Sequence, residues 1–113
     1  MSYKPSQKDV IWIDFDPARG FEINKRRPAV VLSSNDYNNA TKYAIVAPIT
    51  QTDLTAGNLY ELKDHKTKGK VNTAQIYSLD VTKRANRKPE FIEKMKEADF
   101  QNVAQLVKFN FDF

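Results

Sequence analysis

Residues 10–15 read Val-Ile-Trp-Ile-Asp-Phe, a run rich in β-branched and aromatic side chains. Its period of two predicts a strand, with Ile11, Ile13 and Phe15 on one face. The runs at residues 29–33 and 43–49 are also apolar and of strand length, and turn-forming polar residues follow each of them. We therefore expect the first half of the chain to be built from strands.

The second half continues in short strands and ends in a helix. Residues 59–62, 71–78 and 91–96 bring the expected set to about six or seven strands. Asp99 is the expected N-cap of a terminal helix, and a short helical turn is expected at residues 35–39. The apolar positions behind this cap recur at helical spacing: Phe100, Val103, Ala104 and Val107. This order favours a mainly β fold, a strongly bent sheet or half-open barrel with a carboxy-terminal α-helix, because closure hides strand edges in a short chain.

The length and composition of the chain exclude several kinds of domain organisation and functional site. The 113 residues suffice for one domain, expected to span residues 1–113. The absence of cysteine excludes disulfides, thiolate zinc sites and cysteine nucleophiles. The single histidine, His65, lies in a lysine-rich run and is expected to be solvated. Because no segment is apolar enough to cross a bilayer and no signal-peptide core is visible, we expect a cytoplasmic protein that has no membrane contact. We also expect no cofactor.

Positive charge is concentrated in one part of the sequence. Residues 63–88 carry eight basic and two acidic side chains, whereas residues 1–62 carry seven of each. Lys and Arg side chains neutralise phosphates and release condensed counterions. The segment therefore suits a polyanionic partner, although an ordinary solvated loop accounts for the charge equally well.

The segment at residues 16–28 is longer than most loops of compact domains, and long loops of this kind are usually functional or disordered. It contains four basic residues and an isolated Glu22. Pro28 favours an extended conformation for Arg27, which would aim its guanidinium in a fixed direction at the start of the second strand. We therefore expect this loop to be functional.

Four stretches together resemble one known family. Residues 9–33 read Asp-Val-Ile-Trp-Ile-Asp-Phe-Asp-Pro-Ala-Arg-Gly-Phe-Glu-Ile-Asn-Lys-Arg-Arg-Pro-Ala-Val-Val-Leu-Ser, and they resemble the opening signature of the MazF/PemK toxins almost continuously. Residues 37–39 (Tyr-Asn-Asn), 46–50 (Val-Ala-Pro-Ile-Thr) and 74–80 (Ala-Gln-Ile-Tyr-Ser-Leu-Asp) follow in the order of that family. The resemblance covers nearly the whole chain and extends to the wider CcdB/Kid-like toxin superfamily.

The resemblance implies a type II toxin, a sequence-specific endoribonuclease that acts on single-stranded RNA. It also implies an SH3-like barrel, a homodimer with two RNA sites near its interface, and a MazE-like antitoxin with a disordered acidic segment. Arg27 and Thr50 match the positions treated as catalytic, with Glu22 beside them. Two departures are Lys8, where the family usually has Gly, and Phe21, where Ser is common; both leave activity or specificity open.

The residue types suit RNA cleavage by the neighbouring 2′-hydroxyl without a metal. The planar fork of Arg27 can hold two phosphate oxygens, but its high pKa makes it a poor base. Glu22 is the candidate for accepting the 2′-hydroxyl proton. Thr50 is the candidate for donating a hydrogen bond from its hydroxyl to the phosphate. The candidates for contacting RNA bases are Phe21, Asn24, Gln51 and Gln75, and those for contacting phosphates are Lys25, Arg26 and Arg84.

Two alternatives stay open at this point. Asp14, Asp16 and Glu22 are carboxylates of the kind that hold Mg²⁺ in metal-dependent nucleases. A non-catalytic toxin or binding module of the CcdB type is the other alternative. Those gyrase poisons have a tryptophan near the carboxyl end, whereas this chain ends in Phe-Asn-Phe-Asp-Phe and has its only tryptophan at Trp12. The phenylalanines of this ending, Phe109, Phe111 and Phe113, are expected to cover core or an interface.

Overall fold

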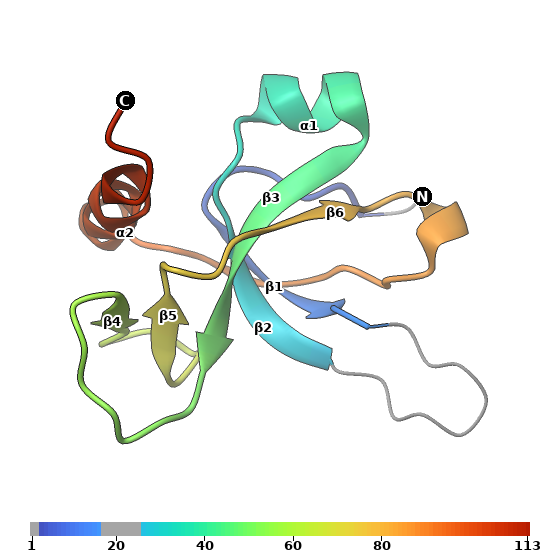
Figure 1. Cartoon of the computed structure of the whole chain (residues 1–113). Helices are drawn as coiled ribbons and strands as arrows, with labels where there is room; N and C mark the ends of the chain where they lie inside the picture. Colours follow the sequence, from blue (N-terminus) through green and yellow to red (C-terminus); the bar gives the residue numbers. More distant parts are fainter. Residues whose placement is uncertain (1–2, 17–25) are drawn as a thin grey trace.

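The structure is a computed structural model that describes residues 3–16 and 26–113. Its elements are β1 (Asp9–Asp14), β2 (Arg26–Val31), α1 (Asn35–Thr41), β3 (Tyr43–Thr50), β4 (Leu59–Glu61), β5 (Lys70–Asn72), β6 (Tyr77–Asp80), the 3₁₀ turn η1 (Lys83–Ala85), β7 (Glu90–Lys94) and α2 (Glu97–Phe109). Within the described ranges, the strands form one antiparallel sheet in the order β4-β5-β3-β2-β1-β7, and β6 pairs with the first half of β3 (Figure 1). The expected mainly β fold with a terminal helix is confirmed.

The alternation in β1 divides the core between the two faces of the sheet. On one face, the α2 residues Phe100 and Val103 cluster with five strand side chains: Val10, Val30, Ala47, Ile49 and Val71. The other face carries a second cluster of buried side chains: Ile11, Ile13, Ala29, Val31, Ala44, Val46 and Leu79. We call these the α2 face and the concave face. The centre of the sheet is buried on both sides, which explains why residues 29–33 and 43–49 read as continuous apolar runs.

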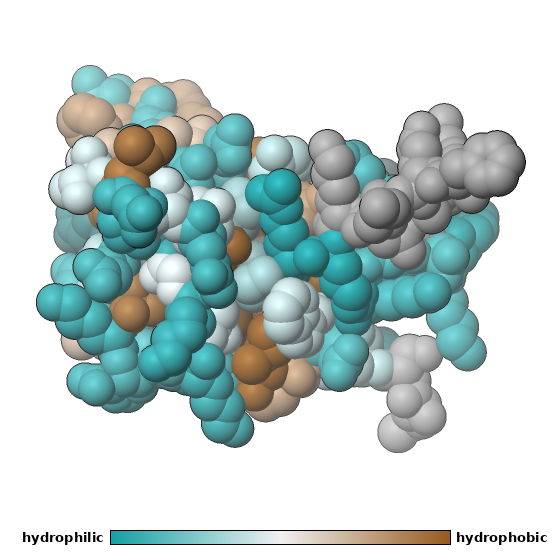
Figure 2. Space-filling view, turned by 90° about the horizontal axis from the view of Figure 1, so that it is seen from below, coloured by the Kyte–Doolittle hydropathy of each residue, from teal (hydrophilic) through white to brown (hydrophobic). Residues whose placement is uncertain are grey.

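The sheet is strongly bent, as expected for a half-open barrel. β1 and β6 are not neighbours in the sheet, yet the rings of Phe15 and Tyr77 meet with centroids 5.0 Å apart. In Figure 1, β6 lies beside β3 and leads to the 3₁₀ turn η1. Seen from below, the surface is mostly hydrophilic, with small apolar areas between polar side chains (Figure 2). None of the helices in the described residues is long and apolar enough to cross a membrane.

Two expected element bounds are wrong. The run at residues 71–78 is two strands, β5 and β6, because the polypeptide turns between them and each pairs with a different half of β3. Asp99 lies inside the first turn of α2, and Lys96 is the N-cap residue. The amide of Phe100 already donates to the Lys96 carbonyl at 2.9 Å. The Asp99 carboxylate instead accepts a 2.5 Å hydrogen bond from the Tyr60 hydroxyl, which joins α2 to β4.

The expectation that His65 is solvated is also wrong, because its side chain is 1% exposed. The backbone amide of Lys96 donates to Nε2 at 3.3 Å, so the Nδ1 atom carries the proton and donates to the Lys63 carbonyl at 2.8 Å. His65 therefore connects the segment after β4 to the start of α2. Its role is structural.

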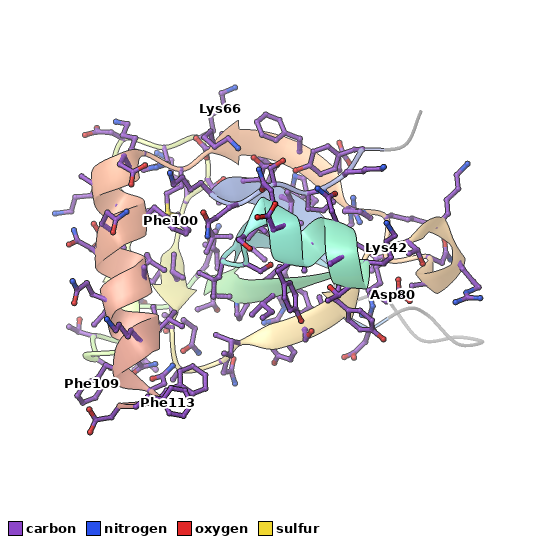
Figure 3. All side chains as sticks on the ribbon, turned by 90° about the horizontal axis from the view of Figure 1, so that it is seen from above. Lys42, Lys66, Asp80, Phe100, Phe109 and Phe113 are labelled. Carbon is purple, nitrogen blue, oxygen red and sulfur yellow. The ribbon has the colours of Figure 1, made fainter. Side chains whose placement is uncertain are left out.

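The phenylalanines at the carboxyl end do not cover core. Phe109 is 81% exposed and Phe111 is 50% exposed, and Phe113 is fully exposed with its ring stacked on Phe111. Figure 3 shows Phe109 and Phe113 at the end of α2, on the opposite side of that view from Lys42 and Asp80. The expectation that these rings cover core is therefore wrong, and an interface stays the prediction for them.

Lys8 occupies a turn that favours glycine. Its φ of 78° lies in the left-handed region, which is costly for a residue with a Cβ atom. Its backbone amide donates to the Val31 carbonyl at 2.9 Å, and its carbonyl accepts from the Met95 amide at 2.8 Å. Lys8 thus joins β2 to the segment before α2 despite its side chain, and its Nζ atom lies 2.6 Å from Glu97.

Candidate functional site

Arg27 and Thr50 lie on neighbouring strands near one edge of the concave face. In the ladder between β2 and β3, Ala29 is opposite Pro48. The same register extended by two residues sets Arg27 opposite Thr50, and opposed residues of an antiparallel ladder project to the same side. Arg27 is exposed and Thr50 is half-buried. In the described part of the chain, no carboxylate forms an ion pair with Arg27. The two residues expected to be catalytic therefore converge on an open surface.

Thr50 is held in place by the strand on its other side. It is paired with Lys70 of β5, next to Gly69. Gly69 has a φ of 132°, and a Cβ atom there would lie 2.8 Å from the Thr50 carbonyl oxygen. A residue other than glycine would force the end of β3 to shift. The sequence analysis missed this contact, because a single glycine does not reveal which backbone approaches it.

Arg26 points to the other face and is occupied by carboxylates. One guanidinium nitrogen donates to Asp14 Oδ1 at 2.9 Å and another to Glu90 Oε1 at 3.1 Å. The Asp14 side chain is 2% exposed, so this bond neutralises a buried charge. The expected phosphate contact of Arg26 thus competes with two internal partners. Asp14, considered above as a Mg²⁺ ligand, is engaged by Arg26, while Asp16 is exposed.

An aromatic pair that the sequence analysis did not assign to the site lies beside it. Phe15 and Tyr77 meet edge to face, at an interplanar angle of 75°. The Arg87 guanidinium donates to the carbonyls of Asp14 and Phe15, which fixes the end of β1. Tyr77 is 40% exposed. Its strand pattern indicated a sheet residue, but the contact with Phe15 depends on the bend of the sheet.

The remaining candidates are dispersed. Gln51 follows Thr50 directly and is exposed. Gln75 is exposed in the turn after β5, where its Oε1 atom accepts from Asn72 Nδ2 at 3.2 Å. Arg84 is exposed on η1. Four expected site residues lie outside the described residues: Phe21, Glu22, Asn24 and Lys25.

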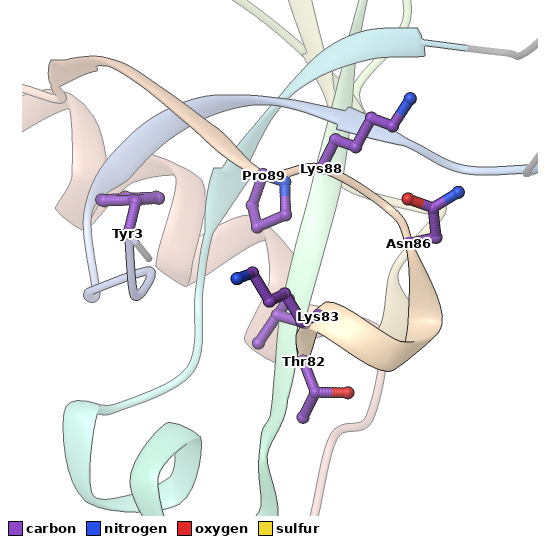
Figure 4. A pocket seen from close by; sticks show the side chains of 7 residues that line it. Tyr3, Thr82, Lys83, Asn86, Lys88 and Pro89 are labelled. Carbon is purple, nitrogen blue, oxygen red and sulfur yellow. The ribbon is translucent and has the colours of Figure 1, made fainter. Parts of the chain in front are cut away.

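A second polar surface lies at the other end of β3. Around η1, a hollow of about 260 Å³ is lined by Lys83, Lys88, Thr82 and Asn86 together with Tyr3 and Pro89 (Figure 4). An adjoining hollow shares Tyr3 and Lys83 and adds Lys4 and Lys42. The described residues lining the two hollows include no carboxylate. Lys42 and Thr50 are separated by the length of β3, about 26 Å at the usual rise per residue. Lys88 lies nearer the Arg27 site, because it also lines a hollow with Asp14 and Arg26.

Tyr3 is an uncharged residue that lines that hollow. Burial raises the pKa of the Tyr3 hydroxyl, and its hydrogen bond to the Asp9 carboxylate raises the pKa further. The phenol therefore stays protonated and donates to Asp9 at neutral pH. Asp9 also accepts from the Ser6 amide at 3.0 Å and pairs with Lys94. These contacts anchor the amino-terminal segment to β1.

Comparisons with known proteins agree with this fold. The family model of PemK-like, MazF-like toxins of type II toxin–antitoxin systems matches residues 6–111. Endoribonuclease toxin MazF of Escherichia coli (strain K12) is 50% identical over 48 residues, which are 42% of this chain and 43% of that protein. This alignment thus spans less than half the length of that relative. Endoribonuclease MazF9 of Mycobacterium tuberculosis is 33% identical over 114 residues, covering 90% of this chain and 92% of that relative.

A solved structure extends the similarity to three dimensions. The crystal structure of MazE–MazF (Form-II) from Deinococcus radiodurans matches with a TM-score of 0.83 and 27% identity, covering 96% of each chain. The fold thus matches that solved structure over almost the entire chain, and the family model and the MazF9 relative cover nearly the same residues. From this agreement we conclude that the chain belongs to the family of PemK-like, MazF-like toxins of type II toxin–antitoxin systems.

Proposed function

We propose that this chain is an endoribonuclease toxin that cleaves single-stranded RNA by attack of the neighbouring 2′-hydroxyl, without a metal. The observation that carries the proposal is the placement of Arg27, a guanidinium with no ion-pair partner among the described residues, opposite Thr50 on an exposed surface. Membership of the toxin family supports it, as do two relatives that are named endoribonucleases.

The chemistry follows from the charge that builds on the phosphate. The 2′-oxygen attacks the adjacent phosphorus, the bond to the 5′-oxygen breaks, and the leaving 5′-oxygen takes a proton from water. The products are a 2′,3′-cyclic phosphate and a 5′-hydroxyl. Arg27 binds two non-bridging oxygens and stabilises the extra negative charge of the transition state. The Thr50 hydroxyl donates to the same group. Since Arg27 stays protonated, another group must take the 2′-hydroxyl proton, and we propose Glu22 for this step.

RNA binding draws on exposed groups around this pair. Gln51 and Gln75 supply hydrogen-bonding edges for bases, together with Phe21 and Asn24. Lys25 and Arg84 supply phosphate contacts. Arg26 contributes less than the sequence predicts, because Asp14 and Glu90 hold its guanidinium.

The test is digestion of a long single-stranded transcript in excess EDTA, followed by analysis of the new ends. We expect cleavage that leaves a 5′-hydroxyl and a 2′,3′-cyclic phosphate or 3′-phosphate, while a duplex of the same sequence resists. A 5′-phosphate product or a requirement for Mg²⁺ would favour a carboxylate-bound metal instead. Inhibition of DNA supercoiling without RNA cleavage would favour the non-catalytic alternative. Sequencing the 5′ ends identifies the cleavage sequence.

We further propose that the toxin acts as a homodimer in the cytoplasm and that an acidic antitoxin segment inhibits it. A flexible peptide of carboxylates and interleaved apolar residues can wrap a phosphate-binding surface and order on binding. The apolar residues are needed because exposed ion pairs contribute only about 0–1 kcal/mol each. Titration of a bound, uncleavable RNA with the antitoxin peptide should displace the RNA. Simultaneous binding with cleavage still blocked would indicate a separate inhibitory site.

A further inference from the structure

Tyr77 is an aromatic residue whose ring is not buried in the core. It is opposite Val46 in the ladder between β6 and β3, so it projects to the concave face, which Val46 also lines. Its side chain is 40% exposed. Burial in the core therefore accounts for only part of the ring, and a large apolar surface remains in contact with solvent.

The orientation of this ring is fixed by its neighbours. Tyr77 meets Phe15 edge to face with centroids 5.0 Å apart, a favourable aromatic geometry. Phe15 packs against the cluster of the concave face. The Arg87 guanidinium donates to the Phe15 carbonyl. The backbone carbonyl of Arg87 accepts from the Asp14 amide at 2.8 Å. A ligand that stacks on Tyr77 thus loses little free energy in ordering the ring.

The ring lies close to the proposed reaction centre. Phe15 follows Ile13 by two residues, about 7 Å along an extended chain, and Ile13 is the Cα partner of Arg27. Arg27 and Val31 are four residues apart on β2, so both project to the concave face. Val31 is opposite Val46, the partner of Tyr77. Tyr77 and Arg27 therefore border the same face of the sheet.

We propose that Tyr77 is the stacking platform for one base of the RNA, next to the scissile phosphate. This inference rests on the proposed function and makes Tyr77 a specificity-determining residue of the same site. Single-stranded RNA presents unstacked bases, and proteins hold them on exposed aromatic rings close to phosphate-binding guanidinium groups. The aromatic face of Tyr77 and the charge of Arg27 supply these two elements.

The experiment measures binding of a short RNA that contains the cleavage sequence and a 2′-O-methyl group at the scissile position. Fluorescence anisotropy compares the wild type with Tyr77→Ala, Tyr77→Phe and Tyr77→Leu. We expect about ten- to a hundred-fold weaker binding for Tyr77→Ala and Tyr77→Leu, and near wild-type binding for Tyr77→Phe. The matched control is Tyr43→Ala, because Tyr43 is 42% exposed but projects to the opposite side of β3. It should bind as the wild type does.

A second set of RNAs, each with one abasic position, distinguishes stacking from a structural effect. One position should weaken binding to the wild type strongly and to Tyr77→Ala hardly at all. Equal losses at every position in both proteins would overturn the assignment. So would dimer dissociation or unfolding of Tyr77→Leu, measured by light scattering and thermal melting. If the wild type cleaves RNA but Tyr77→Ala matches Tyr43→Ala, only the stacking role fails. If the wild type neither binds nor cleaves RNA, the proposed function fails with it.

Discussion

Arg26 and Arg27 are adjacent in the sequence and carry the same charge, but they project to opposite faces of β2. Arg26 is bonded to the buried Asp14 and to Glu90, and its guanidinium completes the scaffold beneath β1 and β7. Arg27 is exposed on the concave face, next to Thr50 and without a carboxylate partner in the described ranges. A strand thus gives one arginine a structural role and leaves the other available for the role that we propose, because successive residues alternate between faces.

The number of basic residues in a segment therefore does not locate a phosphate site. A guanidinium saturated by internal carboxylates has little left to offer an anionic ligand, whereas an unpaired guanidinium on an open surface attracts one.

The largest effect is expected for Arg27→Ala. Loss of the guanidinium removes stabilisation of the phosphorane and should lower the cleavage rate on the order of 10²- to 10³-fold. Arg27→Lys should restore little, because the fork geometry is lost. Single-turnover cleavage kinetics measure this, with thermal melting as the control for folding. If Arg27→Ala cleaves normally, the reaction centre lies elsewhere.

Arg26→Ala should lower the stability of the fold and leave the cleavage rate almost unchanged. Removing one partner of the buried Asp14 carboxylate should lower the free energy of unfolding by about 1–3 kcal/mol, with little change in the cleavage rate at a temperature where the variant is folded. The matched control is Glu90→Gln. The Glu90 side chain is 69% exposed, so this change should cost less than about 1 kcal/mol. Urea unfolding measures both. Intact stability with weaker RNA binding and a smaller salt dependence would instead place Arg26 at the RNA.

Acid should weaken the scaffold through Glu93. Burial alone would raise the pKa of this carboxyl, but hydrogen bonds from the Thr67 hydroxyl and from the amides of Lys66 and Thr67 outweigh it and hold the pKa below its usual value. A carboxylate with a lowered pKa stabilises the fold above the unfolded-state value, about 4.3, and the benefit is lost as the pH falls through the folded-state value.

Urea unfolding between pH 7 and pH 3 should therefore show a loss of stability below about pH 4.3, and Glu93→Gln should reduce that loss. The same substitution should cost about 1–2 kcal/mol at pH 7, because charge-assisted hydrogen bonds are replaced by weaker ones. A variant with unchanged acid dependence would show that other carboxylates, such as Asp80 or Glu97, dominate it.

The smallest effect is expected for Lys8→Gly. Glycine adopts the φ of 78° without strain, which should stabilise the fold by up to about 1 kcal/mol. The lost ion pair with Glu97, whose side chain is 61% exposed, offsets this by a fraction of that amount. Thermal melting measures the balance. Cleavage should be unchanged, and a change in cleavage would mean that the scaffold and the Arg27 site are coupled.

Much of the fold could be predicted because its signals are local. Alternation of apolar side chains identified β1, whose Ile11 and Ile13 are buried on the concave face. Pro28 follows Arg27 and indicated an extended backbone there, which β2 confirms. The spacing of Phe100 and Val103 identified the buried side of α2. Such patterns depend only on the geometry of one strand or helix, so a short stretch of sequence determines them.

The tertiary structure alone decided which side chains meet. Arg26 contacts Glu90 across 64 positions of the sequence, and Tyr77 meets Phe15 only because the sheet bends. His65 appeared solvated in its lysine-rich surroundings, yet the start of α2 covers it. No local pattern encodes these partners, because strand pairing and sheet curvature bring distant residues together. The sequence therefore determined the elements and the identity of Arg27 as a candidate, whereas the closure of the sheet decided which charges are neutralised and which remain available to a substrate.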